Sequence, residues 1–101
     1  IDLRIEVPRP SHRELSGPPS GDDSATVRAR VLAARARQQA RAGVCNALLG
    51  GEALQRDCVL AEAERRLLEQ AAERGWLSAR AYHRVLRVAR TLADLDGVER
   101  I

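Results

Sequence analysis

The stretch LSARAYHRVLRVARTLADLDG, residues 77–97, decides the fold of this sequence. Ser78 is a natural N-cap, apolar residues then recur every three or four positions, and Gly97 follows the last of them. This spacing predicts one amphipathic helix over residues 79–94. Its expected inner face consists of Tyr82, Val85, Leu86, Ala89, Leu92 and Ala93.

Most of the remaining chain also has helical character. The 101 residues are 45% hydrophobic and 2% aromatic, with 17 alanines and few Val, Ile or Thr, which excludes most all-β folds. Three further helices are expected over residues 25–42, 52–58 and 60–74. The first of these carries an apolar stripe of Val27, Val31 and Ala34, with Leu32 beside it. The inner face of the last is expected to consist of Leu60, Ala63, Leu67, Leu68, Ala71 and Ala72.

The first 23 residues have a different pattern. Residues 1–8 alternate apolar and charged side chains, which predicts a strand, but no later segment is expected to pair with it. Residues 9–23 are rich in Pro, Gly and Ser and are expected to form a linker. The sequence therefore predicts an all-α fold, a small four-helix bundle over residues 24–101 with a detached N-terminal strand and a flexible linker. Because the chain does not begin with Met and its strand lacks a partner, we expect it to be a piece of a longer protein.

Charge and side-chain chemistry limit the classes of function. All 17 basic residues are Arg and the formal net charge is +3, which permits a nucleic-acid surface without requiring one. Cys45 and Cys58 form no CxxC pattern, and neither His12 nor His83 has a partner at metal or nucleophile spacing. We therefore expect two reduced thiols in a cytoplasmic protein, with no metal site and no self-contained catalytic site. No apolar run approaches the roughly 20 residues that cross a bilayer, so no membrane partner is expected.

A row of arginines runs along the helix expected over residues 79–94. Arg80, Arg84 and Arg87 are spaced i, i+4 and i+7, so they share one helix face. Permanently charged guanidinium groups in a row suit polyphosphate or a nucleic-acid backbone, although such spacing is more often the solvated face of an amphipathic helix. The arginines of residues 25–42 allow the same two interpretations. No aromatic residues interleave with them, so base stacking is not indicated.

Three stretches, taken together, carry a family resemblance. They are IDLRIEVP (1–8), VRARVLAARARQQAR (27–41) with Asn46 and Ala47 shortly after, and LSARAYHRVLRVARTLADLDG (77–97). In this order they resemble the C-terminal part of the magnesium chelatase-related AAA+ ATPases, and most closely the competence-associated ComM/YifB-like branch. The resemblance covers nearly the whole chain.

The resemblance implies a domain organisation that the residues alone do not provide. Residues 24–101 would form the helical lid of the ATPase, residues 9–23 a linker, and residues 1–8 a terminal strand of the ATPase core. The nucleotide-binding motifs of the family would lie upstream. The chain alone would then be no enzyme, while the longer chain would be an ATPase that uses ATP and Mg²⁺.

The resemblance also implies roles for individual arginines. Arg80 matches the family's sensor-2 arginine at the start of a lid helix, where it would act on the nucleotide of a neighbouring subunit. Arg84, Arg87 and Arg90 would then contact phosphate or a subunit interface, and the last two are expected at the surface. Together with Thr91 and Asp94, Arg90 is also expected to form hydrogen bonds at the helix end.

The function implied in this way is the coupling of ATP binding and hydrolysis to subunit motion. The partners would be the core of the same chain and the neighbouring subunits of a homo-hexamer, and the longer chain would act on DNA as a translocase. Two alternatives remain open. One is a stand-alone basic helical module that binds nucleic acid, and the other is the lid of a metal-chelatase motor subunit.

Overall fold

The computed structural model describes residues 2–101, and all of its regular structure is helical. Five α-helices and one 3-10 helix follow one another, and residues 2–101 contain no strand. In chain order the elements are α1 (His12–Ser16), α2 (Ser24–Ala42), η1 (Asn46–Leu48), α3 (Gly51–Asp57), α4 (Glu62–Glu73) and α5 (Ala79–Asp96). The all-α prediction is confirmed, and the four expected helices correspond to α2, α3, α4 and α5.

The two long helices begin and end where the sequence indicates. The Asp23 carboxylate accepts a hydrogen bond of 2.7 Å from an amide in the first turn of α2, and the Ser78 hydroxyl accepts one of 3.1 Å in α5. Both helices end at a glycine in the left-handed region, with φ 70° at Gly43 and 73° at Gly97. Other residues rarely adopt this conformation, so the ends of α2 and α5 are determined by local sequence.

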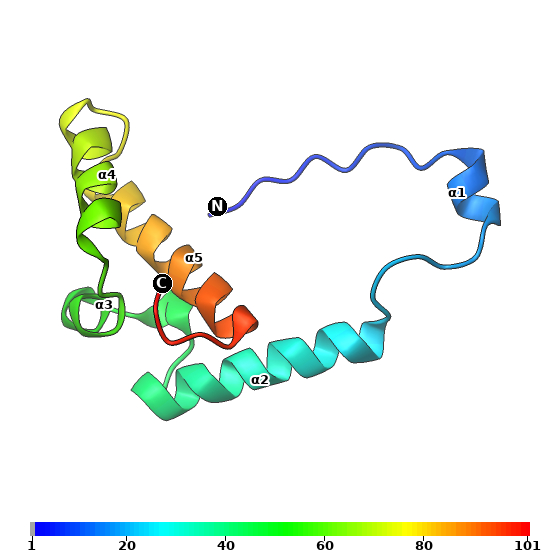
Figure 1. Cartoon of the computed structure of the whole chain (residues 1–101), viewed down its shortest axis with the longest axis horizontal. Helices are drawn as coiled ribbons and strands as arrows, with labels where there is room; N and C mark the ends of the chain where they lie inside the picture. The colour runs from blue at the N-terminus through cyan, green and yellow to red at the C-terminus, as the bar shows by residue number, and fades with distance from the viewer. Residues whose placement is uncertain (1) are drawn as a thin grey trace.

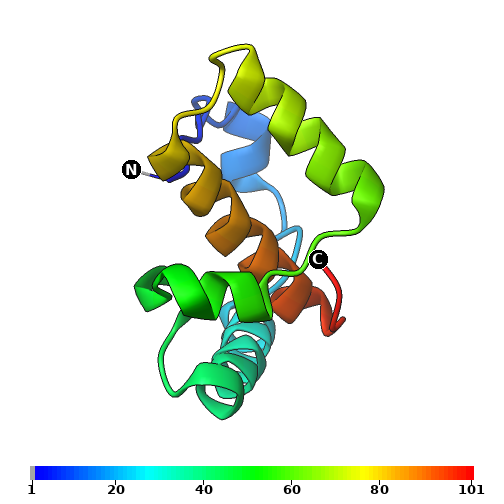
Figure 2. The same ribbon diagram turned by 90° about the vertical axis from the view of Figure 1, so that its left-hand side faces the viewer.

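Helix α5 is the central element of the helical part. It packs against α2, η1, α3 and α4, and Figure 1 shows α2 and α4 at its opposite ends. In Figure 2, turned by 90°, α3 crosses α5 between α2 and α4. A small hydrophobic core lies near the crossing of α3 and α5 and consists of Leu49, Leu54, Cys58 and Leu86.

Burial differs from the predicted inner faces in three helices. Ala34, Leu86 and Ala93 are buried as expected. Among the apolar residues predicted to be inside, the exposed ones are Val27, Val31, Leu32, Ala63, Leu67, Ala72, Val85 and Leu92. The reason is the open packing, because the first half of α2 extends beyond α5 and α4 packs mainly on one neighbour. An amphipathic helix that lacks a neighbour along part of its length exposes the apolar face that the pattern assigns to the interior.

The predicted N-terminal strand is not present in the described residues. Residues 2–11 have no regular secondary structure, and Ile1 lies outside the described residues. A strand needs a second strand to satisfy its backbone donors and acceptors, and residues 2–101 provide none. The alternating pattern therefore does not produce a strand in this structure.

The segment that precedes α2 contains a short helix that the sequence analysis did not predict. The hydroxyl of Ser11 accepts a hydrogen bond from the Glu14 amide, and the Glu14 carboxylate accepts one from the Ser11 amide, both at 3.1 Å. This capping box starts α1, and its Ser-x-x-Glu pattern is readable in the sequence. The N-terminal end of the chain lies beside α5 (Figure 1), and the Asp2 carboxylate is 2.9 Å from Nε of Arg84. Because of this wide loop the radius of gyration is 17.0 Å, against about 13 Å for a compact domain of this length.

Candidate functional site

Arg80 lies in the first turn of α5 with an exposed side chain. Ser78 caps this end of the helix, so the amides of Ala79 and Arg80 have no acceptor within the helix. Among residues 2–101, no carboxylate forms an ion pair with Arg80. An unpaired guanidinium beside the positive end of a helix dipole can bind an anionic group such as a phosphate.

The next two arginines of the predicted row are held by other parts of the chain. Arg84 is half-buried and pairs with Asp2. Arg87 donates from Nε and Nη2 to the backbone carbonyl of Leu49, at 3.3 and 3.0 Å. The three arginines share a helix face as predicted, but the structure does not gather them into one phosphate site.

Arg90 is buried, which contradicts the predicted surface position. Only 3% of the residue is exposed. Its Nη1 donates to the carbonyl of Glu99 at 2.6 Å, and its Nη2 donates to the carbonyl of Val98 at 3.0 Å. The physical reason is the reversal of the chain at Gly97, which brings these carbonyl groups back to α5. Arg90 therefore attaches the C-terminal segment, which lies beyond the end of the helix, to α5.

A buried ionic cluster joins α2, η1 and α5. Asp94 has no exposed surface, and its carboxylate accepts hydrogen bonds from Nη1 and Nη2 of Arg41, the first at 3.2 Å. It also accepts a bond of 2.9 Å from Asn46 Nδ2, and Arg90 Nη2 lies 3.2 Å from the same carboxylate. Arg37 donates to the backbone carbonyl of Asp94 at 2.7 Å. The cluster thus links the last turns of α2 to the last turns of α5.

Sequence reasoning grouped Arg90, Thr91 and Asp94 at the end of the helix, but it did not connect them with Arg41, Asn46 or Gln38. The backbone amide of Asn46 also donates to Oε1 of Gln38 at 2.9 Å, and its Nδ2 donates to the Thr91 hydroxyl at 3.0 Å. A signal was present, because Gln38 follows the buried Ala34 by one helical turn on α2. Asp94 follows Arg90 in the same way, but polar residues at such positions are normally assigned to the helix surface.

The electrostatics of the cluster favour the charged form of Asp94. Burial by itself would raise the pKa of this carboxyl group, but the hydrogen bonds from Arg41 and Asn46, together with the charges of Arg41 and Arg90, outweigh burial and hold the pKa below its ordinary value. The same pairing raises the pKa of Arg41. Since Asp94 is inaccessible and every polar group around it belongs to the same domain, the arrangement positions helices and does not offer a reactive group to a substrate.

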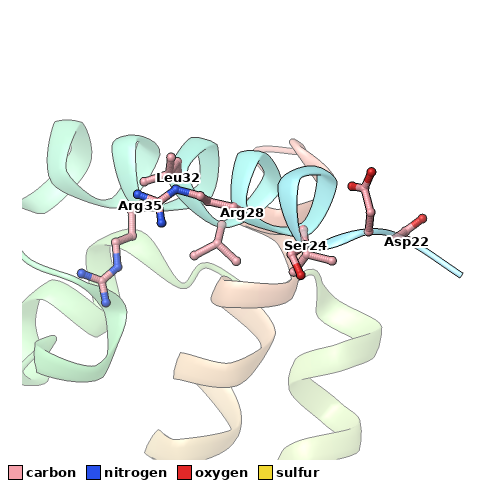
Figure 3. A pocket seen from close by; sticks show the side chains of 8 residues that line it. Asp22, Ser24, Arg28, Leu32 and Arg35 are labelled. Atoms are coloured by element: carbon pink, nitrogen blue, oxygen red, sulfur yellow. The ribbon is translucent and has the colours of Figure 1, made fainter. Parts of the chain in front are cut away.

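An open groove runs along the exposed half of α2 (Figure 3). Asp22 and Ser24 lie at one end, and Arg28, Leu32 and Arg35 follow along the helix. Leu32 is 53% exposed, so this surface is accessible. Its mixture of acidic, basic and apolar side chains contains no nucleophile paired with a base.

The remaining reactive side chains do not assemble into a site. Cys45 is half-buried and Cys58 is buried, both are free thiols, and burial raises the pKa of Cys58 and so lowers its reactivity. His83 is exposed, and its ring packs edge-on against Tyr82. Within residues 2–101, no group of three or more His, Cys, Asp or Glu side chains could hold a metal ion. None of the described helices combines the length and the apolar character needed to cross a membrane.

Comparison with protein families gives one match to this domain. The family described as magnesium chelatase, subunit ChlI C-terminal, matches residues 21–101. The match begins just before α2 and includes both the buried cluster and the exposed Arg80. It leaves out the N-terminal segment that loops away from the helices.

Comparison with individual proteins extends the similarity to the N-terminal segment. Competence protein ComM of Haemophilus influenzae is 45% identical over 102 residues, which cover 100% of this chain and 20% of that protein. Uncharacterized protein YifB of Salmonella typhimurium is 44% identical over 102 residues, with the same two coverages. YifB of Escherichia coli is 42% identical over 97 residues, 95% of this chain and 19% of its own. The chain therefore spans about one fifth of the length of these relatives. No solved structure matches it significantly.

Proposed function

Because this chain belongs to the magnesium chelatase-related family and corresponds to the C-terminal region of its ComM- and YifB-like members, we propose that it is the helical lid of an AAA+ ATPase. In this proposal residues 24–101 form the lid, residues 9–23 are the linker, and residues 1–8 belong to the ATPase core. ATP and Mg²⁺ are held by the core, and the lid couples the nucleotide state to the movement of subunits.

Arg80 is the residue that senses the nucleotide in this proposal. The observation that carries it is a contrast within α5. Arg84, Arg87 and Arg90 each have an acceptor inside the chain, whereas Arg80 is exposed at the positive end of the helix and has no ion-pair partner in residues 2–101. A fixed positive charge in this position neutralises charge on a terminal phosphate, and loses that contact when the phosphate leaves.

The buried ionic cluster can transmit a movement of α5 to α2. Helix α5 is about 27 Å long, at 1.5 Å per residue for 18 residues, and Arg80 lies in its first turn. At that end Asp94 is bonded to Arg41 of α2. A shift of α5 on nucleotide release therefore moves α2 with it, because breaking the buried ion pair would cost several kcal/mol, roughly 3–5.

The proposal extends to the longer chain and its partners. We infer a homo-hexamer in which the lid contacts its own core and a neighbouring subunit, and in which the longer chain acts on DNA as a translocase. The support is that one relative is named as a competence protein and that α2 carries five arginines and no acidic residue. The lid of a metal-chelatase motor subunit is an alternative that differs in the partner of the longer chain.

The test replaces Arg80 by Ala in the longer chain that contains this domain. ATP turnover at saturating ATP is expected to fall about tenfold or more, because an arginine that stabilises the transferring phosphoryl group contributes strongly to the rate. Arg28→Ala is the matched control, since Arg28 is exposed on the first half of α2. Wild-type turnover in the Arg80→Ala protein would contradict the sensing role.

A stand-alone nucleic-acid-binding module is the second candidate function. The observation in its favour is the surface of α2, where the exposed Arg28, Arg30 and Arg35 lie without an ion-pair partner in the described residues. A module of this kind binds duplex DNA with an affinity that falls steeply with salt. Titration of the 101-residue chain with duplex DNA, followed by chemical shifts of α2, tests it, and unchanged shifts would exclude it.

A further inference from the structure

The corner between α4 and α5 exposes the single tryptophan of the chain. Trp76 is 69% exposed. The backbone beneath it is ordered by hydrogen bonds, because the Trp76 amide donates to the carbonyl of Ala71 at 2.9 Å and the Gly75 amide donates to that of Ala72 at 3.0 Å. Gly75 adopts φ 76°, as expected for a helix that ends in this type of turn. The indole is therefore presented to solvent by a defined turn.

Guanidinium groups flank this indole in the chain. The Arg74 guanidinium lies 5.1 Å from the centroid of the Trp76 ring, a cation–π arrangement. Arg80 follows on the other side of the turn, in the exposed first turn of α5. Residues 72–76 and 78–80 are all exposed, so the ring and both cations are accessible.

The surroundings of Trp76 favour a nucleotide over a protein partner. The nearest large exposed hydrophobic residues along the chain are Leu67 on α4 and Val85 on α5, each more than two helical turns away. A tryptophan at a protein interface is normally surrounded by contacts that exclude water, whereas the exposed residues next to Trp76 in the chain are small or charged. An aromatic ring among arginines is instead typical of surfaces where bases stack and phosphates are neutralised.

We propose that the α4–α5 corner binds a nucleotide unit, with the base stacked on Trp76 and the phosphate held by Arg74 or Arg80. This unit, a base with an adjacent phosphate, occurs both in a single strand of nucleic acid and in a free nucleotide. The arginine-rich residues 25–42 contain no aromatic side chain on which a base could stack, whereas Trp76 is exposed at another place. The proposal does not depend on Arg80 sensing ATP in a longer chain.

The test uses Trp76 itself as the probe. Because the chain has no second tryptophan, stacking of a base on Trp76 is expected to quench the whole tryptophan emission of the 101-residue chain. One titration uses single-stranded oligothymidylate and a second uses ATP. Because Trp76→Leu removes the fluorescent probe, its binding is measured with labelled oligothymidylate and labelled ATP. The variant is expected to bind roughly tenfold or more weakly, as for loss of one stacked base. Trp76→Tyr retains an aromatic ring and is expected to retain most of the affinity.

The outcomes separate the two sources of the nucleotide. If the oligonucleotide quenches Trp76 and the effect weakens steeply with salt, the ligand is a single strand of nucleic acid. If ATP quenches Trp76 and the oligonucleotide does not, the ligand is a free nucleotide. The proposal is overturned if neither ligand quenches Trp76, or if Trp76→Leu binds as tightly as the unaltered chain. Circular dichroism and the urea midpoint confirm folding, which an exposed residue such as Trp76 hardly affects.

Discussion

The Asp94 carboxylate at the end of α5 is bonded to both terminal nitrogens of the Arg41 guanidinium on α2, and Asp94 has no exposed surface. The two residues are 53 positions apart in the chain, so the pair fixes one helix against the other over a long sequence separation. The Arg41 side chain keeps 23% of its surface exposed, so the acidic partner of the pair is fully buried and the basic partner is partly exposed. Asn46 and Arg90 complete the set of donors around the carboxylate.

Replacing Asp94 by Asn is expected to lower the free energy of unfolding by about 3 kcal/mol or more. The amide cannot compensate the charges of Arg41 and Arg90, and the second of these is buried. Urea unfolding followed by circular dichroism measures the change. Asp22→Asn is the matched control, because Asp22 is exposed, and its effect should stay within about 0.5 kcal/mol. Equal midpoints for the two variants would show that the cluster does not stabilise the fold.

The cluster also makes the free energy of unfolding depend on pH. Burial acts to raise the pKa of Asp94, but the bonds from Arg41 and Asn46 and the charges of Arg41 and Arg90 together outweigh it, so the folded-state pKa lies below the ordinary value of 3.8. A carboxyl group of this kind contributes its full stability at pH values above the unfolded-state pKa. That contribution is lost as the pH falls from this value through the folded-state pKa.

The pH dependence is measured as a difference between two proteins. Other carboxyl groups, such as Asp57, also have a lowered pKa, so the slope of the unaltered chain is not due to Asp94 alone. The difference in unfolding free energy between the unaltered chain and Asp94→Asn is expected to be constant near neutral pH and to shrink below about pH 4. A difference that stays constant down to pH 2 would contradict the shift.

Two leucines test which apolar residues form the core. Leu54 on α3 is 2% exposed, and Leu67 on α4 is 67% exposed. Leu54→Ala is expected to lower the free energy of unfolding by about 3 kcal/mol, through lost burial and the cavity left behind. Leu67→Ala should cost less than about 1 kcal/mol, although the helical pattern places Leu67 on the inner face. If the two variants lose comparable free energy of unfolding, Leu67 is part of the core and the exposed position of its side chain is contradicted.

The helices could be predicted from sequence because their limits are local. Asp23 and Ser78 accept hydrogen bonds from amides three residues away, and Gly43 and Gly97 adopt a conformation that other residues avoid. Burial could not be predicted in the same way. Whether an apolar residue such as Leu67 is covered depends on which helices pack together, and that is decided by contacts far apart in the sequence.

The arginines of the candidate site show the same limit. Spacing places Arg80 and Arg87 on one face of α5, but it does not reveal that the Leu49 carbonyl accepts from Arg87 and that no carboxylate of the described residues reaches Arg80. The resemblance places Arg90 at the surface or at a subunit interface, and most arginines of folded proteins are exposed. The carbonyl groups that bury it come from residues beyond Gly97, after the chain has reversed.

Gly97 is where this reversal can be tested. Its φ is 73°, and a Cβ at this position would lie 3.2 Å from Nη2 of Arg37, whose Nη1 donates to the carbonyl of Asp94. Gly97→Ala is therefore expected to lower the free energy of unfolding by about 1 kcal/mol or more, since the backbone is strained and Arg37 must move. Gly51→Ala is the control, because Gly51 begins α3 and a Cβ there meets nothing within 4 Å. That variant should be neutral or more stable by about 0.5 kcal/mol. If both variants unfold at the same urea concentration, the turn at Gly97 contributes nothing to the attachment of α5 to α2.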